Sequence, residues 1–230
     1  MLTFSELKSL ARLYVPQAKP NIVDDTALSL IINEGALDVA FHSLCLKANT
    51  KFNAVADQSE YNLSSVVTKF LAIDKPGLWW NDGNQWKQLY PKTLKWLDEN
   101  IPTWRDADSG APRWYYQNGN TLGVHPAPAD SLASGFWLYF AQAPTSMTEN
   151  AHYPLHQQGD RTVAQEHLSP LAHSILTFVE WKLHKILNKD EESKMTREMF
   201  INEVTTIMAE IERRPDIEAS SDVKYSGPRF

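Results

Sequence analysis

Two glycine-containing turns near the middle of the chain restrict its fold more than any other feature of the sequence. The first turn, residues 81–84, follows the aromatic run at residues 78–80, and the second turn, residues 117–120, follows the aromatic run at residues 113–116. A second strand-like run comes after each turn. Because Asp-Gly and Asn-Gly supply the positive-φ positions that tight turns need, both segments predict β-hairpins. Another strand is predicted at Phe136–Phe140.

Helical periodicity precedes this strand-rich region. Thr3 and Glu6 have the spacing of a capping box, so a first helix is expected to begin there and to end before Pro16. Asp24 or Asp25 can cap a second helix, whose apolar side chains extend around a broad arc. An apolar arc of this width implies that the helix contacts other elements on more than one side.

Helical periodicity returns in the last third of the chain. Apolar side chains recur at helical spacing over residues 168–186 and again over residues 200–211, which predicts two more helices. The second of these is expected to stop before Pro215. The segment from Asp216 to Phe230 has few apolar residues and contains a Gly-Pro pair, so it cannot form a core of its own.

These patterns together predict an α+β protein. We expect the N-terminal helices, residues 1–51, and the C-terminal helices, residues 151–214, to form one helical bundle. A small antiparallel β domain is expected as an insertion at residues 52–150, with a short helix capped by Thr93 inside it. Residues 215–230 should form an extended C-terminal tail.

The composition argues against several classes of protein. A formal charge of −6 leaves no basic surplus to neutralise phosphates, which makes free nucleic acid a poor candidate for the main partner. The single cysteine, Cys45, cannot form an intramolecular disulfide or a cysteine-based zinc cluster. The residues after Met1 lack the pattern of a signal peptide, and no apolar run approaches the ~18 residues of a membrane span. We therefore expect a soluble protein that does not contact a membrane.

The sequence contains no catalytic motif with a known mechanism. His152 and His156 have the i, i+4 spacing of metal ligands, but Pro154 between them opposes a helix, and a polar loop is the simpler interpretation. Cys45 lies among apolar residues, where a small buried side chain is more usual than a nucleophile. We therefore predict that the chain is not an enzyme and that it needs no metal or other cofactor.

The aromatic middle of the chain permits several interpretations. Seven of the eight tryptophans lie between Trp79 and Trp137. Many of the aromatic side chains should fill the core of the small sheet, because each buries a large apolar area. The others can line a surface between subunits, or they can form a flat platform that stacks on sugar rings or bases. The candidate surface residues are Trp79, Trp80 and Trp86 of the first hairpin.

Residues 79–144 resemble, in order and spacing, the adaptor or head-completion proteins that join portal and tail in tailed phages. The resemblance begins with the tryptophan-rich hairpin and covers a series of short segments. These segments are Leu89–Pro91, Trp104-Arg105, Gly110–Tyr116, Asn118-Gly119, Leu122–Pro128, Phe136–Phe140 and Ala143-Pro144. The plan of helices before and after a β insertion is also similar, so the resemblance extends over most of the chain.

This resemblance implies a structural subunit of the virion neck, at the head-tail junction, that is assembled in the host cytoplasm. Such subunits commonly form a ring of twelve copies, a dodecamer, which docks beneath a portal ring and offers its other face to tail or nozzle proteins. DNA would pass through the lumen without specific binding. The C-terminal tail would contact the portal protein, with Tyr225, Arg229 and Phe230 as candidate anchors, because aromatic residues and arginine dominate interface energetics.

Two functions of other classes stay open. The chain can be a carbohydrate-binding or receptor-binding tail module that uses Trp79, Trp80 and Trp86 as its platform. It can also be an enzyme whose site is assembled from residues without a recognisable motif. Binding to glycans in the absence of portal binding would favour the first alternative. Turnover that a single histidine or aspartate substitution abolishes would favour the second.

Overall fold

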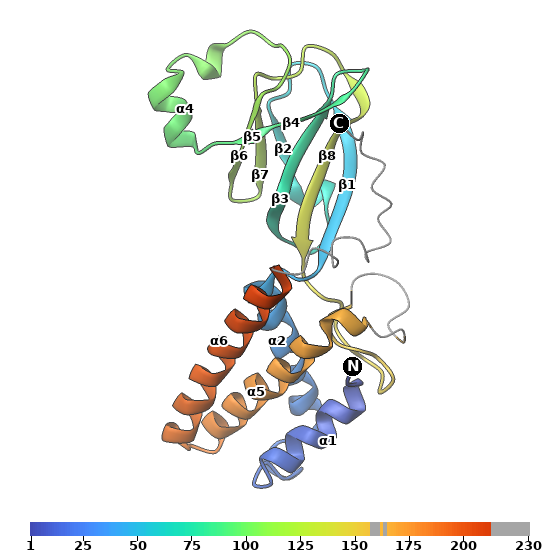
Figure 1. Ribbon diagram of the computed structural model, residues 1–230, viewed down its shortest axis with the longest axis vertical. Helices are drawn as coiled ribbons and strands as arrows, with labels where there is room; N and C mark the ends of the chain where they lie inside the picture. The colour runs from blue at the N-terminus through green and yellow to red at the C-terminus, as the bar shows by residue number, and fades with distance from the viewer. Residues whose placement is uncertain (157–161, 163–164, 213–230) are drawn as a thin grey trace. The chain divides into compact units, whose positions relative to one another are not determined.

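The computed structural model describes residues 1–156, 162 and 165–212, and its helices and sheets confirm the α+β class (Figure 1). The chain divides into two compact units. The helical unit combines Met1–Cys45 with the chain from Pro144 onward, and the β unit is Leu46–Ala143.

The boundaries of the β unit lie earlier in the chain than those of the domain predicted at residues 52–150. Its first strand starts at Lys47 and its last strand ends at Gln142. Regular strand structure therefore sets these boundaries, and residue 52, the predicted start of the domain, lies inside the first strand.

Helices from both ends of the chain contact one another in the helical unit (Figure 1). The described elements are α1 (Phe4–Tyr14), α2 (Asp25–Ser43), the 3₁₀ helix η2 (Glu166–Leu168), α5 (Ser169–Ile186) and α6 (Asp190–Glu212). Helix α5 packs against α1, α2 and α6, and α2 also packs against α1 and α6. The contact between α2 and α5 is close at Gly35, where an added Cβ would lie 2.9 Å from the ring of Phe178.

The predicted N-terminal caps are present. The Thr3 hydroxyl accepts a hydrogen bond from the backbone N–H of Glu6, and the Glu6 carboxylate accepts one from the backbone N–H of Thr3, which completes the capping box. Asp24, not Asp25, caps α2, because its carboxylate accepts the N–H of Ala27 at 2.7 Å.

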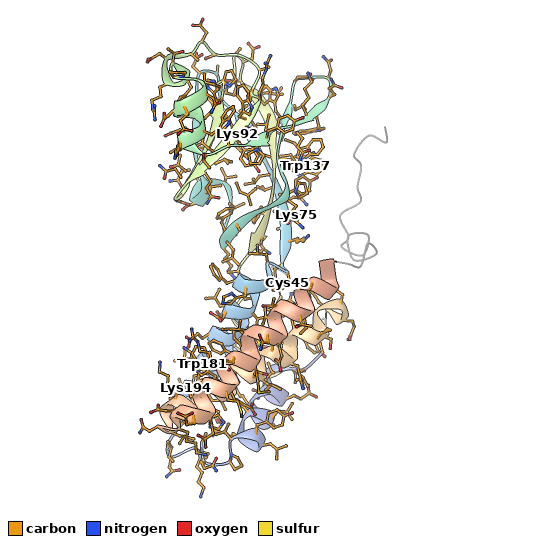
Figure 2. The ribbon with its side chains drawn as sticks, turned by 60° about the vertical axis from the view of Figure 1, so that its left-hand side comes forward. Cys45, Lys75, Lys92, Trp137, Trp181 and Lys194 are labelled. Carbon is orange, nitrogen blue, oxygen red and sulfur yellow. The ribbon has the colours of Figure 1, made fainter. Side chains whose placement is uncertain are left out.

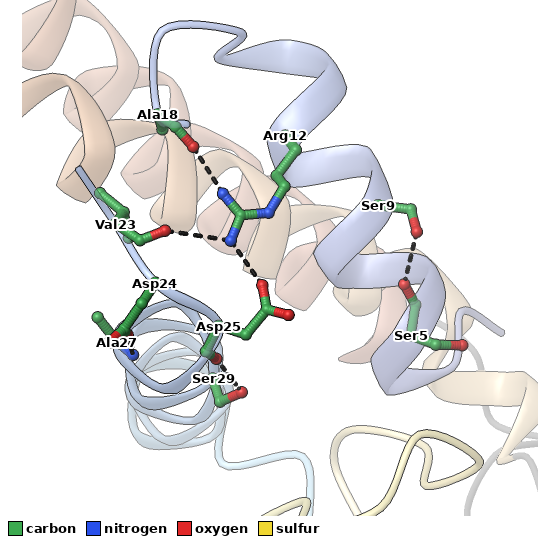
Figure 3. A network of polar contacts seen from close by, with 9 residues as sticks. All are labelled: Ser5, Ser9, Arg12, Ala18, Val23, Asp24, Asp25, Ala27 and Ser29. Atoms are coloured by element: carbon green, nitrogen blue, oxygen red, sulfur yellow. Dashed lines mark hydrogen bonds and ion pairs between the residues drawn. The ribbon is translucent and has the colours of Figure 1, made fainter. Parts of the chain in front are cut away.

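Asp25 takes part in a different contact, which holds the connection between α1 and α2 (Figure 3). The Arg12 guanidinium donates to the Asp25 carboxylate at 2.6 Å and to the carbonyl oxygens of Ala18 and Val23 at 2.6 and 3.1 Å. The hydrogen bond and positive charge of Arg12 hold the pKa of Asp25 below its usual range. One arginine thus satisfies two carbonyls of a loop that has no regular secondary structure.

The contact between α5 and α6 contains two carboxylates. Burial and the nearby charge of Glu203 raise the pKa of Glu180, while the Thr177 hydroxyl donates to Glu203 at 2.9 Å. Because the pKa of Glu180 is higher in the folded than in the unfolded protein, protonated Glu180 contributes fully to stability at low pH. That contribution is lost as the pH rises through the raised pKa.

Replacing Glu180 with glutamine should therefore raise the melting temperature at pH 7 and change it little at pH 4. The gain should stay below about 1 kcal/mol, because solvent screens partly exposed charges. The measurement is thermal unfolding at both pH values. Glu198→Gln, at an exposed position of α6, is a control for the loss of one negative charge. An equal gain at pH 4 would show that repulsion between the carboxylates is not the cause.

The β unit consists of two four-stranded sheets. The first has the order β1 (Lys47–Ala54), β8 (Leu132–Gln142), β3 (Phe70–Asn81) and β4 (Trp86–Gln88). The second has the order β2 (Glu60–Asn62), β7 (Thr121–His125), β6 (Trp114–Asn118) and β5 (Tyr90–Pro91). All pairs are antiparallel except β5 with β6, which is parallel, so the second sheet is mixed and not purely antiparallel as predicted.

Both predicted hairpins are confirmed. Strands β3 and β4 pair on either side of the first turn, and β6 and β7 pair on either side of the second. The positive-φ positions are Gly83 at 92° and Gly119 at 56°. The glycine thus supplies the left-handed conformation in each turn.

A hydrophobic core fills the space between the two sheets. Its members come from both sheets and from the short helix α3 (Leu63–Val66) and include Leu63, Leu78, Trp80, Tyr115, Leu122, Val124, Phe136 and Leu138. Neighbouring residues of a strand point to opposite faces, so Tyr115 enters this core while Tyr116 points to the other face of the second sheet. There Tyr116 packs with the predicted short helix, α4 (Leu94–Asn100), which Thr93 caps.

Candidate interaction surface

Alternation along β8 places aromatic side chains on both faces of the first sheet. Phe136, Leu138 and Phe140 are buried in the core, whereas Trp137 and Tyr139 alternate with them and are half-buried. Figure 2 labels Trp137 on the β unit. Strand β8 therefore carries a pair of large aromatic side chains on the face that lies away from the core.

The register of the neighbouring strands brings further side chains to the same face. Lys51 of β1 and Trp79 of β3 are both cross-strand partners of Trp137, and Asn49 is the partner of Tyr139. Cross-strand partners share a face, so these residues form a continuous row. We call the face made by Asn49, Lys51, Trp79, Trp86, Trp137 and Tyr139 the aromatic face.

A cation lies beside two tryptophan rings of the aromatic face. Trp86 and Trp137 meet edge to face with centroids 5.5 Å apart, and the Lys51 ammonium lies 5.2 and 4.8 Å from the two centroids. The indole N–H of Trp137 donates to the Asn49 side chain at 3.0 Å. These contacts hold the rings in place, because cation–π and edge-to-face geometries are both favourable.

The structure separates the three tryptophans of the predicted platform. Trp80 is only 7% exposed and packs on Phe136 with centroids 5.1 Å apart, so it belongs to the core between the sheets. Trp79 and Trp86 are half-buried on the aromatic face. The surface on this side of the sheet therefore excludes Trp80 and includes Trp137. The alternation of side chains within residues 136–140 could have indicated that Trp137 faces away from the core.

The hairpin tip beside the aromatic face is held by its own side chains. The Asp82 carboxylate accepts hydrogen bonds from Lys87 at 2.6 Å and from the backbone N–H groups of Gln85 and Asn84 at 2.8 and 3.0 Å. These three donors hold the pKa of Asp82 well below its usual range. Asp82 thus stays ionised at neutral pH and is paired with Lys87.

A second aromatic cluster lies on the outer face of the second sheet. Trp114 stacks on His125 with centroids 5.7 Å apart, and burial lowers the pKa of His125. Trp96 of α4 packs against Trp114, and Trp104 of the 3₁₀ helix η1 (Trp104–Asp106) packs against His125. These tryptophans join α4 and η1 to the sheet, so we assign them a packing role.

Cys45 and His152, which the sequence analysis considered as a nucleophile and a metal ligand, have structural roles. Burial raises the pKa of the Cys45 thiol to about 11, which leaves it protonated at neutral pH and unsuited to act as a nucleophile. His152 is buried, and its Nδ1 accepts the backbone N–H groups of Thr148 and Glu149. Its carbonyl oxygen accepts the N–H of Phe4, so this loop holds the start of α1.

Two further findings concern the residues that the structure describes. Among them, no cluster of histidine, cysteine, aspartate and glutamate has the composition of a metal site. None of the described helices is long and apolar enough to cross a membrane. The three predicted tail anchors, Tyr225, Arg229 and Phe230, lie outside the described residues.

A comparison with family models matches residues 2–226 to a family of structural phage adaptors. The chain belongs to the SU10 adaptor protein family. A comparison with curated proteins found no match.

Proposed function

We propose that this protein is the head-to-tail adaptor of a tailed bacteriophage, without enzymatic activity. In this proposal it forms a ring under the portal and connects the portal to tail or nozzle proteins in the neck of the virion. The observation that carries the proposal is the family match, because it extends from residue 2 to residue 226 and so includes the helices, the β unit and most of the tail.

The division of the chain into a helical unit and a β unit supports separate binding roles for the two units. The four long helices would act as a bundle at the portal side, and the β unit would act as an inserted domain that meets other proteins. A closed ring needs two different contact surfaces on each subunit, since a head-to-tail interface joins unlike patches. The ring would be a dodecamer whose acidic subunits let DNA pass through the lumen without gripping its phosphates.

The proposal is tested by measuring the mass of the purified protein with and without its cognate portal protein. Native mass spectrometry or light scattering should detect a ring that forms, or becomes stable, on the portal. A protein that stays monomeric and does not bind the portal at micromolar concentration would contradict the adaptor function.

The C-terminal tail carries a separate prediction. Deleting residues 216–230 should leave a folded protein that has lost most of its portal affinity, because Tyr225, Arg229 and Phe230 are the proposed anchors. Circular dichroism checks the fold, and portal affinity is measured by biolayer interferometry. The matched control replaces the same three residues with alanine and keeps the length of the tail. Unchanged affinity in both variants would place the portal contact elsewhere on the chain.

The aromatic face favours one second candidate function, a carbohydrate-binding or receptor-binding tail module. Half-buried tryptophan rings beside a lysine and an asparagine are suitable for stacking on sugars and for bonding their hydroxyl groups. Glycan-array binding that is lost in Trp86→Ala and Trp137→Ala, together with no binding to the portal, would favour this function over the adaptor.

A further inference from the structure

Strand β1 is an eight-residue strand at the edge of the first sheet. Within the described part of the chain it pairs with β8 alone, along residues 47–52 and at Ala54. Alternate residues of an edge strand point their N–H and C=O groups away from the sheet, where an added strand can bind them. Such an edge is the usual acceptor in recognition by β-strand addition.

The two faces of β1 have different chemistry. Lys47 and Lys51 are exposed and lie on the same face as Asn49. The Lys47 ammonium is 3.6 Å from the Asp74 carboxylate, and the Lys51 ammonium lies beside the rings of the aromatic face, so an added carboxylate would share these cations with their present partners. Ala48 and Phe52 are partly buried against the core between the sheets. An added strand should therefore have carboxylates on one face and small or apolar side chains on the other.

Residues 216–223 of the C-terminal tail, which lie outside the described residues, have this pattern. Their sequence is Asp-Ile-Glu-Ala-Ser-Ser-Asp-Val, with three carboxylates and no basic residue. In an extended segment, Asp216, Glu218 and Asp222 share one face, while Ile217, Ala219 and Val223 share the other. The segment thus alternates in the way that the edge of β1 requires.

The spacing of the charges agrees as well. Glu218 and Asp222 are four residues apart, as are Lys51 and Lys47. An antiparallel alignment that places Glu218 opposite Lys51 also places Asp222 opposite Lys47. It then brings Ile217 to Phe52, on the face toward the core. Opposite charges and apolar pairs in cross-strand positions are each stabilising.

We propose that residues 216–223 of a neighbouring copy add to β1 as an antiparallel strand and so link successive subunits. This inference rests on the ring of the proposed function, because a head-to-tail ring needs a donor and an acceptor that differ and lie on the same chain. Tyr225, Arg229 and Phe230 follow the added strand and stay available for the portal.

Disulfide trapping between two full-length chains tests the pairing. The alignment places Ser220 opposite Asn49, so chains with Asn49→Cys and with Ser220→Cys should become linked when mixed with the portal and mildly oxidised. The native Cys45 is partly exposed, so it is replaced with alanine in every chain, and only the introduced cysteines can then form the link. The control is Ser221→Cys with the same Asn49→Cys partner, because Ser221 would point to the opposite face.

We expect several-fold more linked dimer with Ser220→Cys than with Ser221→Cys. Equal yields in an assembly that forms normally on the portal would overturn the strand pairing and leave the adaptor function intact. Failure to assemble on the portal would overturn both. Linking within one chain, when the double variant is oxidised at high dilution, would overturn the assignment to a neighbouring copy.

A charge exchange provides a second test that does not depend on oxidation. Glu218→Lys and Lys51→Glu should each reduce the fraction of assembled protein on the portal. The double variant should recover a substantial part of it, because the pair is restored with opposite polarity. Additive losses in the double variant would count against a direct contact between the two positions.

Discussion

Replacing Gly123 with alanine should destabilise the β unit by about 3 kcal/mol or more, because a buried ring occupies the space of the new methyl group. An added Cβ would lie 2.0 Å from Cζ of Tyr116, which is the cross-strand partner of Gly123. Tyr116 is 2% exposed, and its hydroxyl reaches across β7 and donates to Glu60 of β2 at 2.9 Å. The ring cannot move without losing this hydrogen bond and its packing against Trp104.

The measurement is chemical unfolding of the Gly123→Ala variant followed by tryptophan fluorescence. Gly110→Ala is the matched control, since the nearest atom to its added Cβ is 4.0 Å away on Pro126. We expect the control to unfold close to the wild-type midpoint. Equal midpoints for the two variants would mean that Tyr116 does not lie over Gly123 in solution.

Replacing Trp80 with alanine should cost about 3–5 kcal/mol, the usual range for a large aromatic side chain removed from a core. The side chain packs between the sheets against Phe136 and is 7% exposed. Trp86→Ala should cost much less, because Trp86 is half-buried on the aromatic face and contacts mainly Trp137 and Lys51. Unfolding midpoints of the two variants measure this difference.

The comparison between these tryptophans also bears on function. A folded Trp86→Ala protein with weakened assembly or ligand binding would assign a binding role to the aromatic face. Trp80→Ala is unsuitable for that purpose, because its losses would follow from unfolding. If Trp86→Ala were as destabilising as Trp80→Ala, the aromatic face would be part of the core, and its role as a surface would have to be abandoned.

The sequence predicted the helix caps and the turns, because each of these depends on residues within a few positions of one another. The capping box of Thr3 and Glu6, the cap at Thr93 and the glycines at 83 and 119 each act within a few residues, and each is present as predicted. The choice between Asp24 and Asp25 as a cap needed the structure. Arg12 binds the carboxylate of Asp25, and it reaches that position only when α1 and α2 have packed.

The aromatic face was predicted only in part, because its composition depends on tertiary packing. Trp79 and Trp86 lie on a surface, but Trp80 is buried, and the main contributions of Trp137 and Lys51 were missed. A period of two separates the faces of a strand, but it does not say which face meets the core. That choice depends on the second sheet, which covers Trp80 and leaves Trp137 on the opposite face.

For the two glycine-containing turns, the sequence alone determined where the chain reverses, because the ability to adopt a positive φ is a property of the glycine itself. It also determined the helices at both ends of the chain, the two hairpins and the alternation within β8, but not β1, β2, α3 or β5. Only the tertiary structure decided that these strands form two sheets, that β1 lies at an edge, and that the aromatic face has a lysine beside its tryptophans. Pairing between distant strands depends on packing across the whole unit, which no short segment of the sequence encodes.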